Sequence, residues 1–109
     1  MTSPLTDKVE HISAHSIRKM FNESQYPVLI ADGQLKPKFV RNSHLKEPQR
    51  VGEPYCTHGQ LIRYLDNTGQ WVVEVFQYLR PDKTIGASGK PDPKRMRIGN
   101  KIFIVDTPT

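Results

Sequence analysis

The stretch QLIRYLDNTGQWVVEVFQYL (Gln60–Leu79) decides the fold. Its central Asp-Asn-Thr-Gly sequence is a turn signal between two runs rich in β-branched and aromatic residues, a pattern typical of a β-hairpin. A strand that is apolar on both faces is covered on both sides. The second run, Gln70–Leu79, has this character, so we expect it at the centre of a sheet. Its apolar residues are Trp71, Val73, Val75 and Leu79 on one face, and Val72, Phe76 and Tyr78 on the other.

Two further turn signals predict hairpins over residues 26–40 and 94–106. The first contains an Asp-Gly pair, which suits a type I′ turn, and the second a Gly-Asn pair, which suits a type II′ turn. Pro37 cannot donate a ladder hydrogen bond, so its strand, Gln34–Val40, belongs at a sheet edge or a bulge. The last strand, Lys101–Asp106, has a continuous apolar run and is expected to be central.

The N-terminal segment, residues 7–23, has the pattern of an amphipathic helix. Asp7, with Glu10 three residues later, forms a start that resembles a capping box. At about 100° per residue, five apolar side chains share one half of this helix. They are Val9, Ile12, Ile17, Met20 and Phe21. The same segment also allows a strand at Val9–Ile12 followed by a shorter helix from Ser13.

Together these elements predict an α+β fold class: one N-terminal helix packed on a twisted antiparallel sheet of about six strands, arranged as three hairpins. Strong twist would also allow the sheet to curl into a partial barrel. The length of 109 residues favours a single domain, residues 1–109.

The sequence argues against membrane-spanning, secreted and disulfide-stabilised classes of protein. The longest apolar runs, Val28–Ala31 and Ile102–Val105, are far too short to span a membrane. Residues 1–20 lack the apolar core of a signal peptide. Cys56 is the single cysteine, which excludes an internal disulfide framework and suits a reducing compartment. We therefore expect a cytoplasmic protein that does not insert into a membrane.

Positive charge is concentrated in two stretches. Sixteen Lys and Arg against 11 Asp and Glu give a net charge of +5. Residues 80–101 carry +5 and residues 36–50 carry +4, so the rest of the chain carries −4. Such segregation is typical of a surface that faces a polyanion.

A nucleic-acid interface is predicted from these stretches and from two tyrosines of the central hairpin. Lysine and arginine would contact phosphates, and tyrosine rings would stack on bases. The candidate residues are Lys36, Lys38, Arg41, Arg63, Tyr64, Tyr78, Arg80, Lys90, Lys94, Arg95 and Arg97.

The segment Gly86–Lys90 resembles part of a phosphate-binding P-loop. A P-loop would need Gly where Thr84 stands and Ser or Thr where Pro91 stands. Neither position has the residue that a P-loop requires, so nucleotide hydrolysis is not expected. A flexible turn explains the glycines, although a backbone nest for an anion is the alternative.

Two patterns in the sequence partly match metal-dependent sites. Asp82 and Asp92-Pro93-Lys94 match the letters of a restriction-type nuclease, but Pro93 fits a strand poorly and both acids lie in a Pro- and Gly-rich segment. A ligand set of His11, His15, Cys56 and His58 lacks the usual zinc spacings. We therefore expect no metal and no cofactor.

A metal-independent ribonuclease is an open alternative. It needs a general base, a general acid and cations around the phosphate. Four histidines could supply the first two: His11, His15, His44 and His58. Cations could come from Arg63, Arg80, Lys94 and Arg95.

The segment LRPDKTIGASGKPDPKR (Leu79–Arg95) resembles a segment of small uncharacterised bacterial and mobile-element proteins. This resemblance implies no fold, cofactor or active-site residue. We predict a small, non-enzymatic, nucleic-acid-binding module of a bacterium or phage. The alternatives are the toxin-like ribonuclease above and an interaction module or inhibitor that presents its basic surface to an acidic protein.

Overall fold

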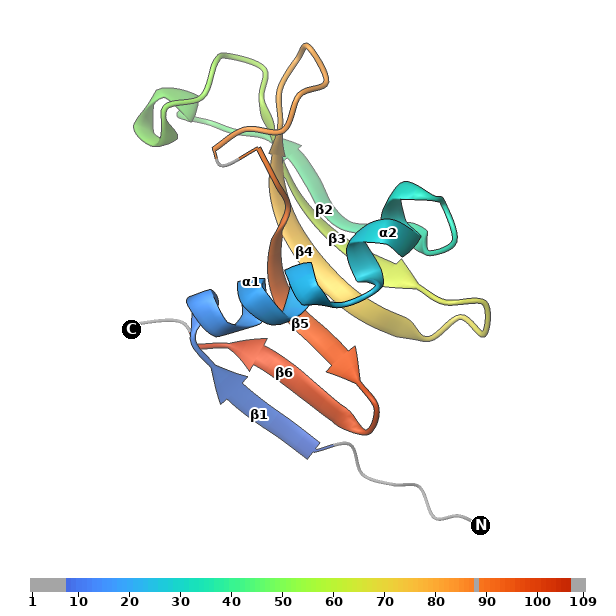
Figure 1. The fold of residues 1–109 in the computed structure, drawn as a ribbon. Coiled ribbons are helices and arrows are strands. Elements are labelled where there is room, and N and C mark those ends of the chain that lie inside the picture. Colours follow the sequence, from blue (N-terminus) through green and yellow to red (C-terminus); the bar gives the residue numbers. More distant parts are fainter. Residues whose placement is uncertain (1–7, 88, 107–109) are drawn as a thin grey trace.

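One six-stranded sheet forms the centre of the fold in the computed structural model, which describes residues 8–87 and 89–106 (Figure 1). The strand order is β1-β6-β5-β4-β3-β2. The strands are β1 (Lys8–Ile12), β2 (Lys36–His44), β3 (His58–Leu65), β4 (Trp71–Leu79), β5 (Asp92–Ile98) and β6 (Lys101–Val105). The helical segments are α1 (Ala14–Glu23), α2 (Tyr26–Ala31) and the 3-10 helix η1 (Pro48–Val51).

The two C-terminal hairpins are confirmed. β3 and β4 pair antiparallel around the turn at residues 66–70, and β5 and β6 pair antiparallel around the turn at residues 99–100. β4 lies between β3 and β5, and β6 lies between β5 and β1, so both strands expected to be central are central. β2, which contains Pro37, is an edge strand.

The helix expected over residues 7–23 was wrong in its first part, and the alternative of a strand followed by a shorter helix holds. Asp7 lies outside the described residues. β1 pairs in parallel with β6, where the backbone N–H of Lys8 donates to the Asn100 carbonyl at 3.0 Å. The Ser13 side chain caps α1 by accepting from the Ser16 N–H. For Lys8–Ile12, pairing with the open edge of β6 is therefore more favourable than the helix that the spacing of its apolar residues predicts. Because β1 is parallel to β6, the sheet is mixed and not fully antiparallel.

The hairpin expected over residues 26–40 is also wrong, because Tyr26–Ala31 forms α2. Pro27 lies in the first turn of α2, where a missing N–H costs nothing. Gly33 has a φ of +76°, and its N–H donates to the Ile30 carbonyl at 3.1 Å, which ends the helix. An Asp-Gly pair serves a helix end as well as a type I′ turn, since both need a positive φ. β2 pairs instead with β3.

Both helices pack on the same face of the sheet (Figure 1). The buried core combines Ile17 and Phe21 of α1 with Leu35, just before β2, and with the sheet residues Ile62, Val72, Val73, Val75, Met96 and Phe103. Full burial of such a side chain stabilises the fold by about 1.5–3 kcal/mol. The sheet does not close into a barrel, since β1 and β2 are its two edges. Neither α1 nor α2 has the length and apolar character that crossing a membrane requires.

Candidate functional site

The face of the sheet opposite the helices carries a row of charged residues. Side chains alternate along a strand, so Val73 and Val75 face the helices while Glu74 faces away. Glu74 stands directly opposite Arg63 on β3 and Arg95 on β5. The Glu74 carboxylate accepts from Arg63 Nε at 2.7 Å and lies 3.5 Å from Arg95 Nε. Two guanidinium groups therefore share one carboxylate in the middle of this face.

Six of the residues predicted from the sequence share this face. Lys38 stands opposite Arg63, and Arg41 stands opposite Leu61 after a bulge in β2, which keeps both on the side away from the helices. The Arg97 guanidinium lies 4.9 Å from the centre of the Trp71 ring. We call the six residues the open-face cations: Lys36, Lys38, Arg41, Arg63, Arg95 and Arg97.

Negative charge is scarce in the same four strands. β2 to β5 contain two acidic residues, Glu74 and Asp92. The Glu74 side chain is 5% exposed, whereas the Arg63 and Arg95 side chains that bind it are 40% and 47% exposed. Asp92, at the start of β5, is bound by Lys94 at 2.8 Å and by Arg18 of α1 at 3.1 Å. The open-face cations therefore outnumber the acid that they surround.

Of the other predicted residues, Tyr78 also lies on this face, and the remaining four lie elsewhere. Tyr64 packs against the core on the helix side, and its burial raises the pKa of the hydroxyl. Tyr78 faces the same way as Glu74, and its ring meets Phe76 edge to face at 5.1 Å. Tyr78, Lys90 and Lys94 line an open cavity of about 620 Å³ beside α1.

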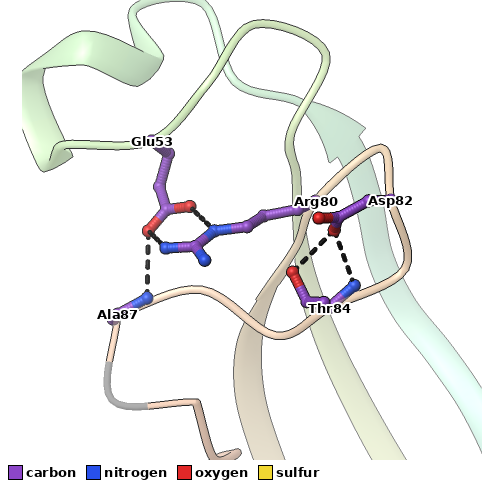
Figure 2. A network of polar contacts seen from close by, with 5 residues as sticks. All are labelled: Glu53, Arg80, Asp82, Thr84 and Ala87. Atoms are coloured by element: carbon purple, nitrogen blue, oxygen red, sulfur yellow. Dashed lines mark hydrogen bonds and ion pairs between the residues drawn. The ribbon is translucent and has the colours of Figure 1, made fainter.

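Arg80 belongs to a separate ion pair that joins two long loops (Figure 2). Its Nε donates to Glu53 Oε1 at 2.7 Å, and the Ala87 N–H donates to Glu53 Oε2 at 2.9 Å. The Glu53 side chain is 1% exposed. In the same loop Asp82 accepts from the backbone and the hydroxyl of Thr84. The ion pair holds loop 45–57 against loop 80–91, so both segments lie at one end of the sheet. Sequence reasoning missed Glu53, because no local pattern links it to a residue 27 positions away.

Acid is expected to weaken this link between the loops. The Arg80 guanidinium lowers the pKa of Glu53 below its usual 4.5, and the Ala87 N–H lowers it further against the opposing effect of burial. The folded state therefore binds a proton less readily than the unfolded chain. This contribution to stability is full above about pH 5 and is lost as the pH falls through the folded pKa.

The measurement is the Tm between pH 3 and pH 7 for the wild type and for Glu53→Gln. We expect the two Tm curves to converge as the pH falls below about 4.5, because protonation of Glu53 removes the negative charge that the Glu53→Gln variant lacks at every pH. Parallel curves over the whole range would contradict this role of Glu53.

The four histidines do not gather in one place. His44 and His58 touch, with 3.2 Å between their Nε2 atoms, while His11 lies 3.5 Å from Asp106. Within residues 8–87 and 89–106, no group of three or more His, Cys, Asp or Glu side chains is placed to hold a metal ion. Among these residues, His11, His15, Cys56 and His58 are therefore not brought together as one ligand set.

The acids of the nuclease-like pattern are engaged separately. Asp82 accepts from Thr84 within its own turn, and Asp92 is bound by Arg18 and Lys94. The expectation that Pro93 would not fit a strand was wrong, because β5 begins at Asp92 and Pro93 stands opposite Val75. A bulge at Lys94 accommodates it, as bulges do for proline.

Comparisons with known proteins give no relative from which a role could be transferred. No protein-family model matches the chain, and neither the search of curated proteins nor the search of solved structures found a match.

Proposed function

We propose that this protein binds nucleic acid through the open-face cations. The observation that carries the proposal is their placement: six Lys and Arg side chains share the face that the helices leave open, around one buried carboxylate. Residues two apart on a strand are about 6.5–7 Å apart, and neighbouring strands are about 5 Å apart. The open-face cations are thus spread widely enough to contact several phosphates of one nucleic-acid strand.

Aromatic side chains on the same face favour a single-stranded ligand. Phe76 and Tyr78 project on the side of Glu74. A bulge in the pairing of β3 with β4 leaves Val72 as an extra residue between Trp71 and Val73. Trp71 therefore lies on the open face beneath the Arg97 guanidinium and Val72 packs in the core, so the faces expected for these two residues from simple alternation were wrong. Bases of a single strand can stack on such rings, whereas the bases of a duplex are already stacked on each other. Phosphate contacts would supply most of the affinity, so binding should depend strongly on salt.

The test compares two triple variants with equal loss of charge. Lys36→Ala/Lys38→Ala/Arg41→Ala removes three open-face cations from the edge strand. We expect its salt dependence, plotted as log K against log salt, to be shallower than that of the wild type by about 2. Fluorescence anisotropy of a labelled single-stranded oligonucleotide at several salt concentrations measures this slope.

The matched control replaces three exposed lysines that lie off this face, in Lys8→Ala/Lys19→Ala/Lys46→Ala. It should keep a slope close to that of the wild type. If both triple variants lose the same amount of slope, binding depends on the net charge of the protein and not on a defined surface. If the wild type binds no oligonucleotide at physiological salt but forms a stoichiometric complex with an acidic protein, the interaction-module alternative replaces this proposal.

The contact between His44 and His58 does not favour the ribonuclease alternative. A general base and a general acid act on opposite sides of the scissile phosphate, so a phosphate must fit between them. Two imidazoles with their Nε2 atoms 3.2 Å apart leave no such space.

A further inference from the structure

The histidine pair occupies the position in the ladder where side chains approach most closely. His44 on β2 stands directly opposite His58 on β3. The Leu45 N–H donates to the Thr57 carbonyl at 3.0 Å, so the adjacent pair is hydrogen-bonded. Because the two kinds of pair alternate in an antiparallel ladder, His44 and His58 form a non-hydrogen-bonded pair. Their ring centres are 4.1 Å apart.

A chain of side-chain amides sets the tautomer of His58. Gln77 Nε2 donates to Gln60 Oε1 at 2.8 Å, and Gln60 Nε2 donates to Asn42 Oδ1 at 3.2 Å. The Asn42 oxygen can therefore only accept at His58 Nδ1, which lies 2.8 Å away. In the neutral ring the proton sits on Nδ1, and the lone pair of Nε2 points toward His44.

We propose that His44 and His58 bind a divalent cation of the zinc class through their Nε2 atoms, with Asn42 as the positioning residue. Two imidazole nitrogens about 2.0–2.1 Å from a tetrahedral zinc lie about 3.3–3.4 Å apart. Adjacent nitrogens of a square-planar site at similar bond lengths lie only about 2.9 Å apart. The observed 3.2 Å is close to the tetrahedral value. Two imidazole rings bound to one tetrahedral zinc would have their centres about 5 Å apart, against the observed 4.1 Å. The exposed His44 ring must therefore turn on binding, so that both Nε2 lone pairs meet at the ion.

The Asn42 contact matches what metal-binding histidines require. Such a histidine uses one nitrogen for the metal and donates the other N–H to a fixed oxygen, which orients the ring. Before a metal binds, His44 Nε2–H donates to His58 Nε2, and on binding the His44 proton moves to Nδ1. Two protein ligands leave the remaining positions to water or to an exogenous ligand.

Zn²⁺ titration of the full chain, by calorimetry or by competition with a chromophoric chelator, tests the proposal. The wild type should bind one Zn²⁺ per chain. His44→Gln and His58→Gln should each weaken binding by at least tenfold, and Asn42→Ala by about tenfold. Imidazole ¹⁵N NMR spectra should show the Nε2 signals of both histidines shifting with Zn²⁺.

Two controls separate this site from the other possible ligands. His11→Gln/His15→Gln removes the remaining histidines, and Cys56→Ser removes a thiol that lines a cavity next to His58. Both should bind Zn²⁺ as the wild type does. Absence of Zn²⁺ binding by the wild type, or loss of binding in either control, would overturn the proposal.

The Tm, measured with and without Zn²⁺, distinguishes loss of the metal site from loss of the fold. His44 is exposed on an edge strand, so His44→Gln should retain the wild-type Tm without metal. Zn²⁺ should raise the Tm of the wild type but not of this variant. An equal rise in both would reject the site. The inference does not rest on nucleic-acid binding, and Lys36→Ala/Lys38→Ala/Arg41→Ala should bind Zn²⁺ normally.

Discussion

Gly86→Ala is expected to lower the Tm by roughly 10 °C, equivalent to about 2–3 kcal/mol of lost stability. A β-carbon at this position would lie 2.5 Å from both carboxylate oxygens of Glu53. The backbone cannot move away easily, because the Gly86 N–H donates to the Tyr78 carbonyl at 2.8 Å. The carboxylate cannot move without losing Arg80 and Ala87. The methyl group therefore forces the two loops apart.

Thermal unfolding followed by circular dichroism measures this loss, and Gly59→Ala is the matched control. A β-carbon at Gly59 would approach the end of the flexible Leu45 side chain at 3.2 Å, which can shift at lower cost. In a Glu53→Ala background, Gly86→Ala should cost much less, because the obstructing carboxylate is gone. Equal costs in both backgrounds would show that the steric account is wrong.

Glu74→Gln should weaken the fold and strengthen nucleic-acid binding at the same time. The substitution keeps the size of the side chain but removes the buried charge that accepts from Arg63 and lies beside Arg95. We expect a loss of about 1–2 kcal/mol, toward the lower end for charged hydrogen bonds because both arginines are partly exposed. With one more uncompensated cation on the open face, affinity near 0.1 M salt should rise about fivefold.

Chemical denaturation and oligonucleotide anisotropy measure the two effects separately. Glu10→Gln removes the same charge from the other side of the sheet, where Glu10 lies 3.5 Å from Lys101. This control should change affinity much less. Weaker binding by a Glu74→Gln protein that is still folded would argue against the open face as the binding surface.

Local patterns in the sequence predicted the C-terminal half of the fold well. The hairpins β3–β4 and β5–β6 follow from turn residues between β-branched runs. The apolar residues on both faces of β4 correctly predicted its central place, but the helices cover only one of those faces. Pro37 placed β2 at an edge. Each of these features is encoded within about twenty neighbouring residues.

The N-terminal half depended on contacts that no local pattern encodes. β1 is a strand because β6 offers it an edge, and the Asp-Gly pair before Gln34 ends a helix instead of turning a hairpin. The ion pair between Glu53 and Arg80 and the contact between His44 and His58 both require the register of separate strands and loops.

The candidate interface was predicted in part. Alternation along β2, β3 and β5 explains why the open-face cations come together once the strand order is known. Composition could not tell them from Arg80 and Lys94, which have the same chemistry but lie away from this face, where they bind Glu53 and Asp92. Nor could it show that Tyr64 faces the core while Tyr78 does not.

The parallel pairing of β1 with β6 also bears on the order of folding. Lys8 pairs with Lys101, so this contact closes a loop that includes nearly all the described chain. Such closure has a high entropic cost, and we expect β1 to dock late, after the local hairpins have formed. During synthesis β1 emerges long before its partner strand, which leaves Ile12 without its core contacts and exposed to chaperones until residues 101–105 leave the ribosome.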